Sequence, residues 1–369
     1  MARALALARR GLGRTYPNPA VGAVFVRGGQ VVGEGFHRRA GGAHAEVEAL
    51  RSARGTVRGA DLYVTLEPCG HEGRTPACAA TLCELGLRRV VVAMVDPNPR
   101  VRGRGIRMLR ASGVRVEVGL GAPEAADVTA GYRSWVTRGR PLITLKLATS
   151  LDGAIATARG HSRWITSPPA RRHAHGLRNV SDAVLVGAET VRQDDPRLTC
   201  RLRGGAHPVR VVVSGPALRL PRRASVFGPE APTWVVTTRH ADPGRAAALA
   251  RLGVEVLRVP SRAETVPFTQ IGPLLGARGI TSLLIEGGGR VAASALRARV
   301  VDRVVWYVAP LVLGGDARAA VGALGVPTVG DGIRLRGVTV TPLGPDVVVT
   351  GSIIPPRGRR PFASSRGAR

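Results

Sequence analysis

The sequence predicts an α/β protein made of two successive units. Apolar runs of strand length alternate with segments of helical periodicity along most of the chain, as in layered α/β folds. A chain of 369 residues corresponds to about two domains of ~150 residues each. The basic Gly/Pro segment Arg138–Pro141 interrupts the alternation, so we place the boundary there, between residues 1–140 and 141–354.

In the first unit, strands and helices are expected to alternate. The expected strands span residues 20–26, 30–36, 61–66, 89–95 and 114–118. The expected helices span residues 44–54, 76–85, 103–112 and 124–137. Pro76 marks the start of the second helix, because proline is favoured in a first helical turn, and Cys78 therefore falls in that turn.

The second unit continues the alternation and is richer in strands near its end. Its expected strands span residues 142–149, 182–187, 209–213, 233–237, 254–259, 281–286, 302–309 and 346–353. Its expected helices span residues 168–178, 267–277 and 290–298. The remaining residues, 355–369, are basic and rich in Pro, Gly and Ser, a composition typical of a disordered tail.

The most informative motif is His44-Ala45-Glu46, followed by Cys69 and Cys78. One imidazole and two thiols form a three-ligand zinc set, which leaves a coordination position open for water as in catalytic zinc sites. A glutamate two residues after the histidine carries protons in zinc deaminases, whose signature is H-x-E followed by P-C-x-x-C. Here eight residues, not two, separate the cysteines.

Any one of these residues alone would be interpreted as ordinary packing, and only the whole set favours a metal site. A helix N-terminus carries partial positive charge, which favours the thiolate of Cys78 that zinc requires. Cys83 and Cys200 have no such neighbours in sequence, so we interpret them as plain core or surface thiols.

Composition limits the cellular setting. Four cysteines, at least two of them assigned to metal, offer no disulfide framework and suggest a reducing compartment. Arginine interrupts the N-terminal apolar stretch too early for a secretory signal, and no run approaches the ~18 apolar residues that span a membrane. We therefore expect a cytoplasmic protein with no membrane partner.

The net charge of +29 raises the question of a nucleic-acid partner. Aromatic residues make up only 4% of the chain, so there is no obvious platform for base stacking. The arginines are spread evenly rather than clustered. We interpret the charge as a solvated basic surface and expect no nucleic-acid partner.

Lys146 is the only lysine among 54 basic residues and lies on the apolar strand 142–149. Alternation places it on one strand face with Thr144 and Ala148. An ammonium group there must meet water, a carboxylate or a ligand. A functional amine and the chance survival of a single lysine are equally good interpretations.

The second unit carries a ligand-binding pattern of its own. The strand Ser282–Glu286 leads into a Gly287–Gly289 turn and then a helix, an arrangement that can hold a phosphate at the helix N-terminus. The same turn can simply connect a strand to a helix. Glu286 ends its strand where α/β sheets place ligands. Trp164 is interpreted either as a stacking surface or as half-buried packing.

A resemblance to a known family runs from about residue 2 to residue 353. Segments such as TYPNPAVGAV, GEGFHRRAGGAHAEVEAL, YVTLEPCGHEGRTPAC, LKLATSLDG, GAETVRQDDPRLT and LLIEGGGRVAASAL resemble, in this order, the bifunctional riboflavin-biosynthesis deaminase/reductase family. The resemblance implies a cytidine-deaminase-like three-layer α/β/α domain, followed by a dihydrofolate-reductase-like α/β domain. It implies Zn²⁺, one per chain, and NADPH as cofactors, and a homo-oligomeric state.

For the first unit, the resemblance implies hydrolytic deamination of 2,5-diamino-6-ribosylamino-4(3H)-pyrimidinone 5′-phosphate. The family's zinc ligands fall on His44, Cys69 and Cys78, and its proton shuttle falls on Glu46. Zinc-activated hydroxide would attack C2 of the pyrimidinone, and ammonia would leave. Segments similar to those that shape the family's base and phosphate pocket contain Asn18, His37, His71 and Arg74.

For the second unit, the resemblance implies NADPH-dependent reduction of the ribosyl to the ribityl side chain. The family's cofactor contacts fall on Ala148, Trp164, Thr190, Asp194, Ser214, Gly288, Gly289, Arg290, Val291, Ala292, Ala293 and Ser294. Its substrate contacts fall on Ser162, Arg178, Leu198, Arg201 and Glu286, to which we add Lys146. The two arginines suit a phosphate, which guanidinium matches in forked geometry. The proton donor is open among Lys146, Asp194 and Glu286.

Two other classes of protein compete with this interpretation. A nucleic-acid-editing zinc deaminase would use the same zinc set and the positive charge, but it would not need the second unit or its IEGGGR turn. A non-enzymatic zinc- or RNA-binding protein would need a fourth metal ligand, and none is obvious in residues 1–140.

Overall fold

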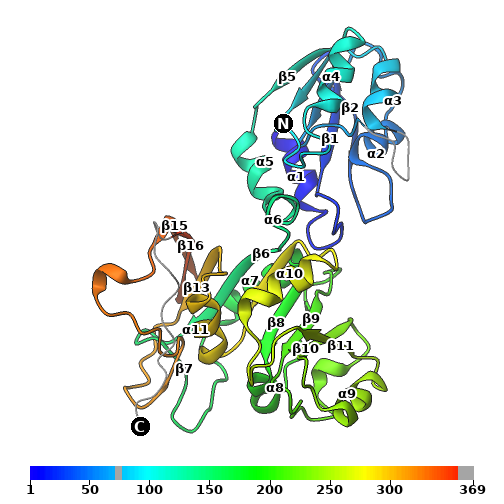
Figure 1. Cartoon of the computed structure of the whole chain (residues 1–369). Helices are drawn as coiled ribbons and strands as arrows, with labels where there is room; N and C mark the ends of the chain where they lie inside the picture. The colour runs from blue at the N-terminus through cyan, green and yellow to red at the C-terminus, as the bar shows by residue number, and fades with distance from the viewer. Residues whose placement is uncertain (71–76, 356–369) are drawn as a thin grey trace. The chain divides into compact units, whose positions relative to one another are not determined.

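The computed structural model describes residues 1–70 and 77–355. His71 and Arg74, which were predicted to shape a pocket, lie outside the described residues, as does the predicted tail beyond residue 355. The chain divides by its internal contacts into two compact units (Figure 1). Unit 1 contains Met1–Arg140 and Gly279–Thr281, and unit 2 contains Pro141–Arg278 and the chain from Ser282.

The sheet of unit 1 has the strand order β2-β1-β3-β4-β5. Its strands are β1 (Gly22–Arg27), β2 (Gln30–Phe36), β3 (Asp61–Val64), β4 (Arg89–Val92) and β5 (Arg115–Val118). β1 pairs antiparallel with β2 and β3, whereas β3, β4 and β5 run parallel. The strands predicted from sequence are therefore confirmed, with small shifts at their ends.

Helices cover both faces of this sheet (Figure 1). They are α1 (Ala2–Arg9), α2 (Ala45–Arg51), α3 (Cys78–Glu84), α4 (Arg104–Ala111), α5 (Ala122–Val128) and α6 (Ala130–Arg138). Ala23 and Phe25 of β1 pack with α2, α3 and α4, whereas Val24, on the opposite face, packs with α1. The expected three-layer α/β/α arrangement is thereby confirmed.

Two features of unit 1 differ from the prediction. The helix expected over residues 124–137 is two helices, because the chain leaves helical geometry at Thr129. The Thr129 hydroxyl donates to the carbonyl of Ala125 at 2.7 Å, a local bond that competes with continuation of the helix. Helix α1 was not predicted. It has only eight residues, and its buried side, which includes Ala4 and Leu7, is too short to show a clear helical period.

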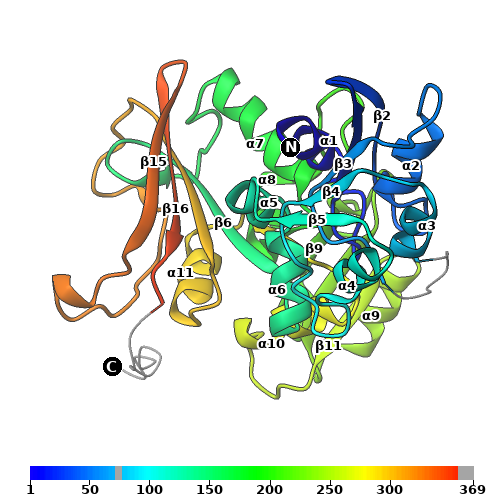
Figure 2. The same cartoon turned by 90° about the horizontal axis from the view of Figure 1, so that it is seen from above.

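Among the described residues, the larger sheet of unit 2 has the order β11-β10-β9-β8-β12-β6-β13-β16-β15. Its strands are β6 (Leu142–Thr149), β8 (Ala183–Gly187), β9 (Val209–Val213), β10 (Thr233–Thr238), β11 (Glu255–Val259), β12 (Ser282–Ile285), β13 (Arg303–Val308), β15 (Leu335–Leu343) and β16 (Asp346–Ile353). The pairs from β11 to β13 are parallel, and β16 and β15 add an antiparallel hairpin at one edge (Figure 2).

Helices and a short second sheet complete unit 2. The helices are α7 (Pro168–Val180), α8 (Ala188–Asp194), α9 (Pro243–Ala250), α10 (Phe268–Gly276) and α11 (Gly289–Arg297), and β7 (Ala154–Ala156) pairs with β14 (Arg318–Ala319). Along β6, Ile143, Leu145 and Leu147 are buried, whereas Lys146 is half-buried on the other face, as the alternation predicts. No helix among the described residues is long and apolar enough to cross a membrane.

Candidate active sites

Three predicted zinc ligands meet beside the carboxyl end of β3 in unit 1. His44 is the N-cap residue of α2, Cys69 follows β3, and Cys78 is the first residue of α3. Their ligand atoms, one from each residue, all lie within 4.8 Å of one another. The His44 Nδ1 atom is 3.1 Å from the Cys78 Sγ and 3.6 Å from the Cys69 Sγ.

The two thiols of this set differ in acidity. Hydrogen bonds from Cys78, together with His44, lower the pKa of the Cys69 thiol to about 4 against the opposing effect of burial. The hydrogen bond to Cys69 and burial raise the pKa of the Cys78 thiol. Of the two thiols, Cys69 therefore ionises more readily, although the start of α3 was expected to favour the thiolate of Cys78. One nitrogen and two sulfur donors at this spacing fit Zn²⁺, which binds such ligands tetrahedrally and here keeps a position for water.

Glu46 lies beside the ligands in the first turn of α2 and is only 5% exposed. Burial raises the pKa of its carboxyl group, while the neighbouring His44 acts in the opposite direction. The Cys78 thiol also acts on this carboxyl group and lowers its pKa. A buried carboxyl group next to the zinc ligands can carry a proton without binding the metal itself.

The buried imidazole of His37 packs against the predicted zinc ligand His44. The rings of His37 and His44 are 5.6 Å apart in an edge-to-face arrangement. His37 Nδ1 is 2.9 Å from the carbonyl of Ala43, so this nitrogen carries the hydrogen and Nε2 is an acceptor. The Asn18 amide nitrogen lies 3.1 Å from Nε2 and is therefore the donor, which fixes the orientation of the Asn18 side chain.

Part of the predicted reductase set lies where β6, β8 and β12 end in unit 2. These three strands are parallel neighbours, so their carboxyl ends share one edge of the sheet. Gly288 is the N-cap residue of α11, and its N–H donates to the Thr190 hydroxyl of α8 at 3.3 Å. The following N–H groups begin the helix and have no acceptor within it. With the exposed Arg290 beside them, they fit a dinucleotide phosphate.

Arg178 and Glu286 form a buried ion pair at this edge. Arg178 Nε and Nη2 donate to the two carboxylate oxygens at 2.7 and 2.8 Å, and its Nη1 donates to the carbonyl of Thr199 at 3.0 Å. Burial alone would raise the pKa of Glu286, but the Arg178 guanidinium dominates and lowers it to about 2. Lys146 also acts on Glu286, and burial lowers the pKa of the lysine itself.

The remaining predicted residues fall into several local groups. Ser162 donates to the Asp194 carboxylate at 3.3 Å, and Arg163 donates to the Asp194 carbonyl. Trp164 is 62% exposed and lies under the Arg171 guanidinium, 4.4 Å from the ring centroid. Ser214 is buried and bonds to its neighbour Gly215 and to Val236.

Other predicted contacts lie inside the fold or beside it. Ala292 and Ala293 are 0% and 2% exposed, so their side chains are covered by the fold and present no surface. Leu198 is buried with a φ of +56°, and Arg201 is exposed. The half-buried residues Ala148, Val291 and Ser294 complete the predicted set.

Tyr307 is a site neighbour that the sequence did not indicate. Its ring centroid lies 5.6 Å from the Lys146 Nζ, and its hydroxyl group is 2.6 Å from the Nδ1 of His173. Tyr307 pairs with Ala148 across the parallel strands β13 and β6. The signal available in the sequence was only an apolar strand, which does not indicate the neighbouring strand or the register.

Comparison with known proteins identifies both halves. A family model of the cytidine and deoxycytidylate deaminase zinc-binding region matches residues 1–94, and one of the RibD C-terminal domain matches residues 141–349. The riboflavin biosynthesis protein RibD of Bacillus amyloliquefaciens is 41% identical over 362 residues, which cover 97% of this chain and 96% of that protein. RibD of Escherichia coli strain K12 is 40% identical over 360 residues, covering 94% and 96%.

Solved structures that are similar to this chain belong to the same kind of protein. Acinetobacter baumannii RibD, form 1, superposes with a TM-score of 0.85 at 37% identity, covering 96% of this chain and 98% of that chain. A diaminohydroxyphosphoribosylaminopyrimidine deaminase/5-amino-6-(5-phosphoribosylamino)uracil reductase from Thermotoga maritima gives a TM-score of 0.83 at 36% identity, covering 96% and 97%.

The two halves thus match two enzyme classes in one continuous alignment, and the chain is a bifunctional enzyme that joins a zinc-dependent deaminase to an NADPH-dependent reductase. It belongs to the RibD family of riboflavin biosynthesis. Membership confirms the family resemblance, the fold class and the two cofactors, and it favours this function over the nucleic-acid-editing alternative.

Proposed function

We propose that residues 1–140 deaminate 2,5-diamino-6-ribosylamino-4(3H)-pyrimidinone 5′-phosphate and that residues 141–354 then reduce its ribosyl group to ribityl. The observation that carries the proposal is the convergence of His44, Cys69 and Cys78 beside the buried Glu46. It occurs in a chain that aligns with RibD proteins over nearly its whole length.

In the deaminase half, the three ligands would hold zinc through Nδ1 of His44 and the two Sγ atoms. When bound, zinc supplies Lewis-acid activation of water, which lowers the pKa of that water toward neutrality. Glu46 accepts a proton from the water that adds to C2 of the pyrimidinone and delivers a proton to the amine that leaves as ammonia. Asn18 has its amide group oriented by His37, which leaves its carbonyl oxygen to recognise a donor on the base.

In the reductase half, Gly288, Gly289 and Arg290 would hold a phosphate group of NADPH at the start of α11. When bound, NADPH supplies the hydride that reduces C1′ of the ring-opened sugar. The reduction also consumes a proton. Glu286 is a poor donor, because Arg178 keeps its carboxyl group ionised. Asp194 accepts a hydrogen bond from Ser162. Lys146 bears the protons of an ammonium group, so we assign the donor role to Lys146.

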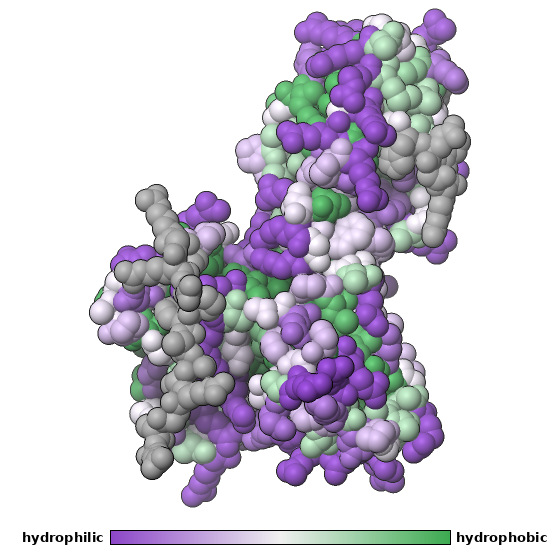
Figure 3. Space-filling view, viewed as in Figure 1, coloured by the Kyte–Doolittle hydropathy of each residue, from purple (hydrophilic) through white to green (hydrophobic). Residues whose placement is uncertain are grey.

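The basic surface does not require a nucleic-acid partner. On the face shown in Figure 3, hydrophilic residues are scattered over both units rather than gathered in one place. A small phosphorylated pyrimidine explains the sites of both units. We also propose a cytoplasmic location, since none of the four cysteines forms a disulfide, as expected in a reducing compartment.

We propose a homo-oligomer on the basis of strand β15. It is the edge strand of the larger sheet, and Val338 and Val340 on it are 51% and 64% exposed. An exposed edge strand with apolar side chains is a template for pairing with another chain. The mass in solution tests this, and a monomer at all accessible concentrations would contradict it.

The activity is tested with purified protein and the diaminopyrimidinone phosphate. Ammonia release, followed by oxidation of NADPH, is the expected result. A chelator should stop ammonia release from this substrate but leave NADPH oxidation with the deaminated intermediate intact. Ammonia release from RNA and not from the pyrimidinone would overturn the proposal.

A further inference from the structure

A carboxylate without an assigned role lies two residues before the ligand Cys69. Glu67 is 4% exposed and makes no ion pair among the interactions of the described residues. It accepts four backbone hydrogen bonds instead. Its Oε2 accepts from Asp96 at 3.1 Å and Gly103 at 2.9 Å, and its Oε1 accepts from Gly105 at 3.0 Å and Ile106 at 3.3 Å.

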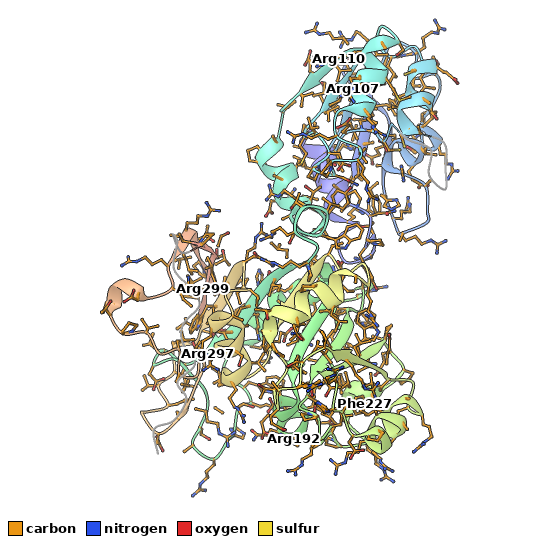
Figure 4. The ribbon with its side chains drawn as sticks, in the orientation of Figure 1. Arg107, Arg110, Arg192, Phe227, Arg297 and Arg299 are labelled. Carbon is orange, nitrogen blue, oxygen red and sulfur yellow. The ribbon has the colours of Figure 1, made fainter. Side chains whose placement is uncertain are left out.

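Three of these donors belong to the start of helix α4, the helix that carries the labelled Arg107 and Arg110 in Figure 4. Gly103 is the N-cap residue of this helix, and Gly105 lies in its first turn. The first N–H groups of a helix have no acceptor within it, and the positive end of the helix dipole favours an anion. Glu67 therefore holds the N-terminus of α4 through both charge and hydrogen bonds.

The N-terminal end of α4 also packs closely against the backbone of residues 68–70, which contain Cys69. A Cβ atom added at Gly105 would lie 1.8 Å from the carbonyl oxygen of Pro68, and one at Gly70 would lie 2.8 Å from the backbone nitrogen of Gly105. Both approaches are closer than any side chain permits. The backbone on either side of Cys69 thus rests directly on α4.

Helix α3 holds Cys69 from its other side. The N–H of Ala79 donates to the Cys69 carbonyl at 3.1 Å, and the N–H of Cys78 donates to the Cys69 Sγ at 3.3 Å. The position of this sulfur is therefore set by the spacing between α3 and the loop that α4 supports. Any slippage of α4 would change the distance from Cys69 to the other two ligands.

We propose that Glu67 is the positioning residue for the zinc-binding thiolate of Cys69, acting through the N-terminus of α4. The proposal rests on the zinc-ligand roles proposed above. A carboxylate is required because each of its oxygens accepts two N–H groups. A glutamine would direct its NH₂ group at one of these pairs, so one pair of donors would lose its acceptor.

The test compares the full-length protein with Glu67→Gln, using Zn²⁺ release to a chelating dye and the absorption spectrum of the Co²⁺-substituted protein. We expect zinc release to be about 10- to 100-fold faster in the variant, as for other residues that orient a metal ligand. The thiolate-to-cobalt absorption bands should shift, because the Cys69–metal geometry changes. A merely structural residue would lower the melting temperature without altering this spectrum.

Asp61→Asn is the matched control. Like Glu67, Asp61 is a buried carboxylate. It is the first residue of β3, whereas Glu67 follows the last one, and it accepts hydrogen bonds from the side chains of Arg88 and Arg89. Its loss should leave zinc release and the cobalt spectrum unchanged, whatever it does to stability. Equal changes in both variants would overturn the proposal.

Glu67→Asp keeps the carboxylate but shortens the side chain by one methylene group, so its oxygens no longer reach all four N–H groups, and it serves if Glu67→Gln does not fold. It should reproduce the faster zinc release and the spectral shift, with a cooperative thermal unfolding transition of residues 1–140 as the check on folding. Wild-type release and spectrum in a folded variant would contradict the inference. Absence of bound zinc in the wild-type protein would instead overturn the proposed ligand roles, so the two failures are distinguishable.

Discussion

Arg178 and Glu286 lie 108 residues apart in the chain and form a forked ion pair with side-chain exposures of only 14% and 7%. Removing one member leaves the other charged and buried. We therefore expect Arg178→Ala to lower the free energy of unfolding by about 3–5 kcal/mol. Urea unfolding monitored in the reductase unit measures the loss, and NADPH oxidation should be abolished with it.

The matched control for this change is Arg192→Ala. Arg192 pairs with Glu189 three residues away on α8, and both side chains are exposed. Its loss should cost at most about 1 kcal/mol. The double variant Arg178→Met with Glu286→Leu should regain stability but not activity, because it leaves no unpaired charge. A wild-type unfolding midpoint for Arg178→Ala would show that the pair does not stabilise the unit.

The low pKa of Glu286 predicts acid sensitivity. Its pKa falls from an ordinary value of about 4.3 to about 2 in the folded protein. Such a carboxylate stabilises the fold fully above its unfolded-state pKa, and this contribution is lost as pH falls through the folded-state value. The difference in unfolding free energy between wild type and Glu286→Gln should therefore narrow from about pH 4.5 downward. A difference that stays constant down to about pH 3 would contradict the assignment.

Lys146 offers a direct measurement because the chain contains no other lysine. Reductive methylation with isotopically labelled formaldehyde marks this amine and the N-terminus. We expect the Lys146 signal to titrate below about 10.4, because burial lowers its pKa. Glu286 raises this pKa, so Glu286→Gln should lower it further, whereas Glu189→Gln should not. An ordinary lysine titration would contradict the prediction.

Glu46→Gln should reduce ammonia release at least about a hundredfold, since the variant cannot accept or deliver a proton. Zinc content and reduction of the deaminated intermediate should be retained. Glu48→Gln is the control, because Glu48 lies on the same helix and pairs with Arg38 and Arg51. Equal loss of deamination in both variants would show that the effect belongs to the helix and not to the carboxyl group of Glu46.

The zinc set was accessible to sequence reasoning because its chemistry demands particular residue types at element ends. Cys78 lies in the first turn of α3, as predicted, although this helix begins at Cys78 itself and not at Pro76, and His44 immediately precedes α2. Glu67 was not accessible. Its partners are backbone N–H groups 29 to 39 residues away. Almost every residue type has such a group, so the sequence does not show which residues donate to Glu67.

In the larger sheet of unit 2, every strand except the exposed edge strand β15 was predicted. β9 and β16 have the predicted bounds, because their apolar residues face a core. β15 was missed, since most of its residues are exposed and no run of buried apolar residues marks it. The pairing of Arg178 with Glu286 was equally hidden, because it depends on how α7 packs beside β12.

The zinc ligands and Glu46 all precede residue 140, whereas every residue assigned to NADPH chemistry follows it. Among the described residues, the side chains proposed for each catalytic centre come from one half of the polypeptide only. Two inactive mutants, one damaged in each half, should thus complement one another when mixed, provided the deaminated product can diffuse between molecules. Poor complementation would mean that this intermediate is handed over without ever becoming free.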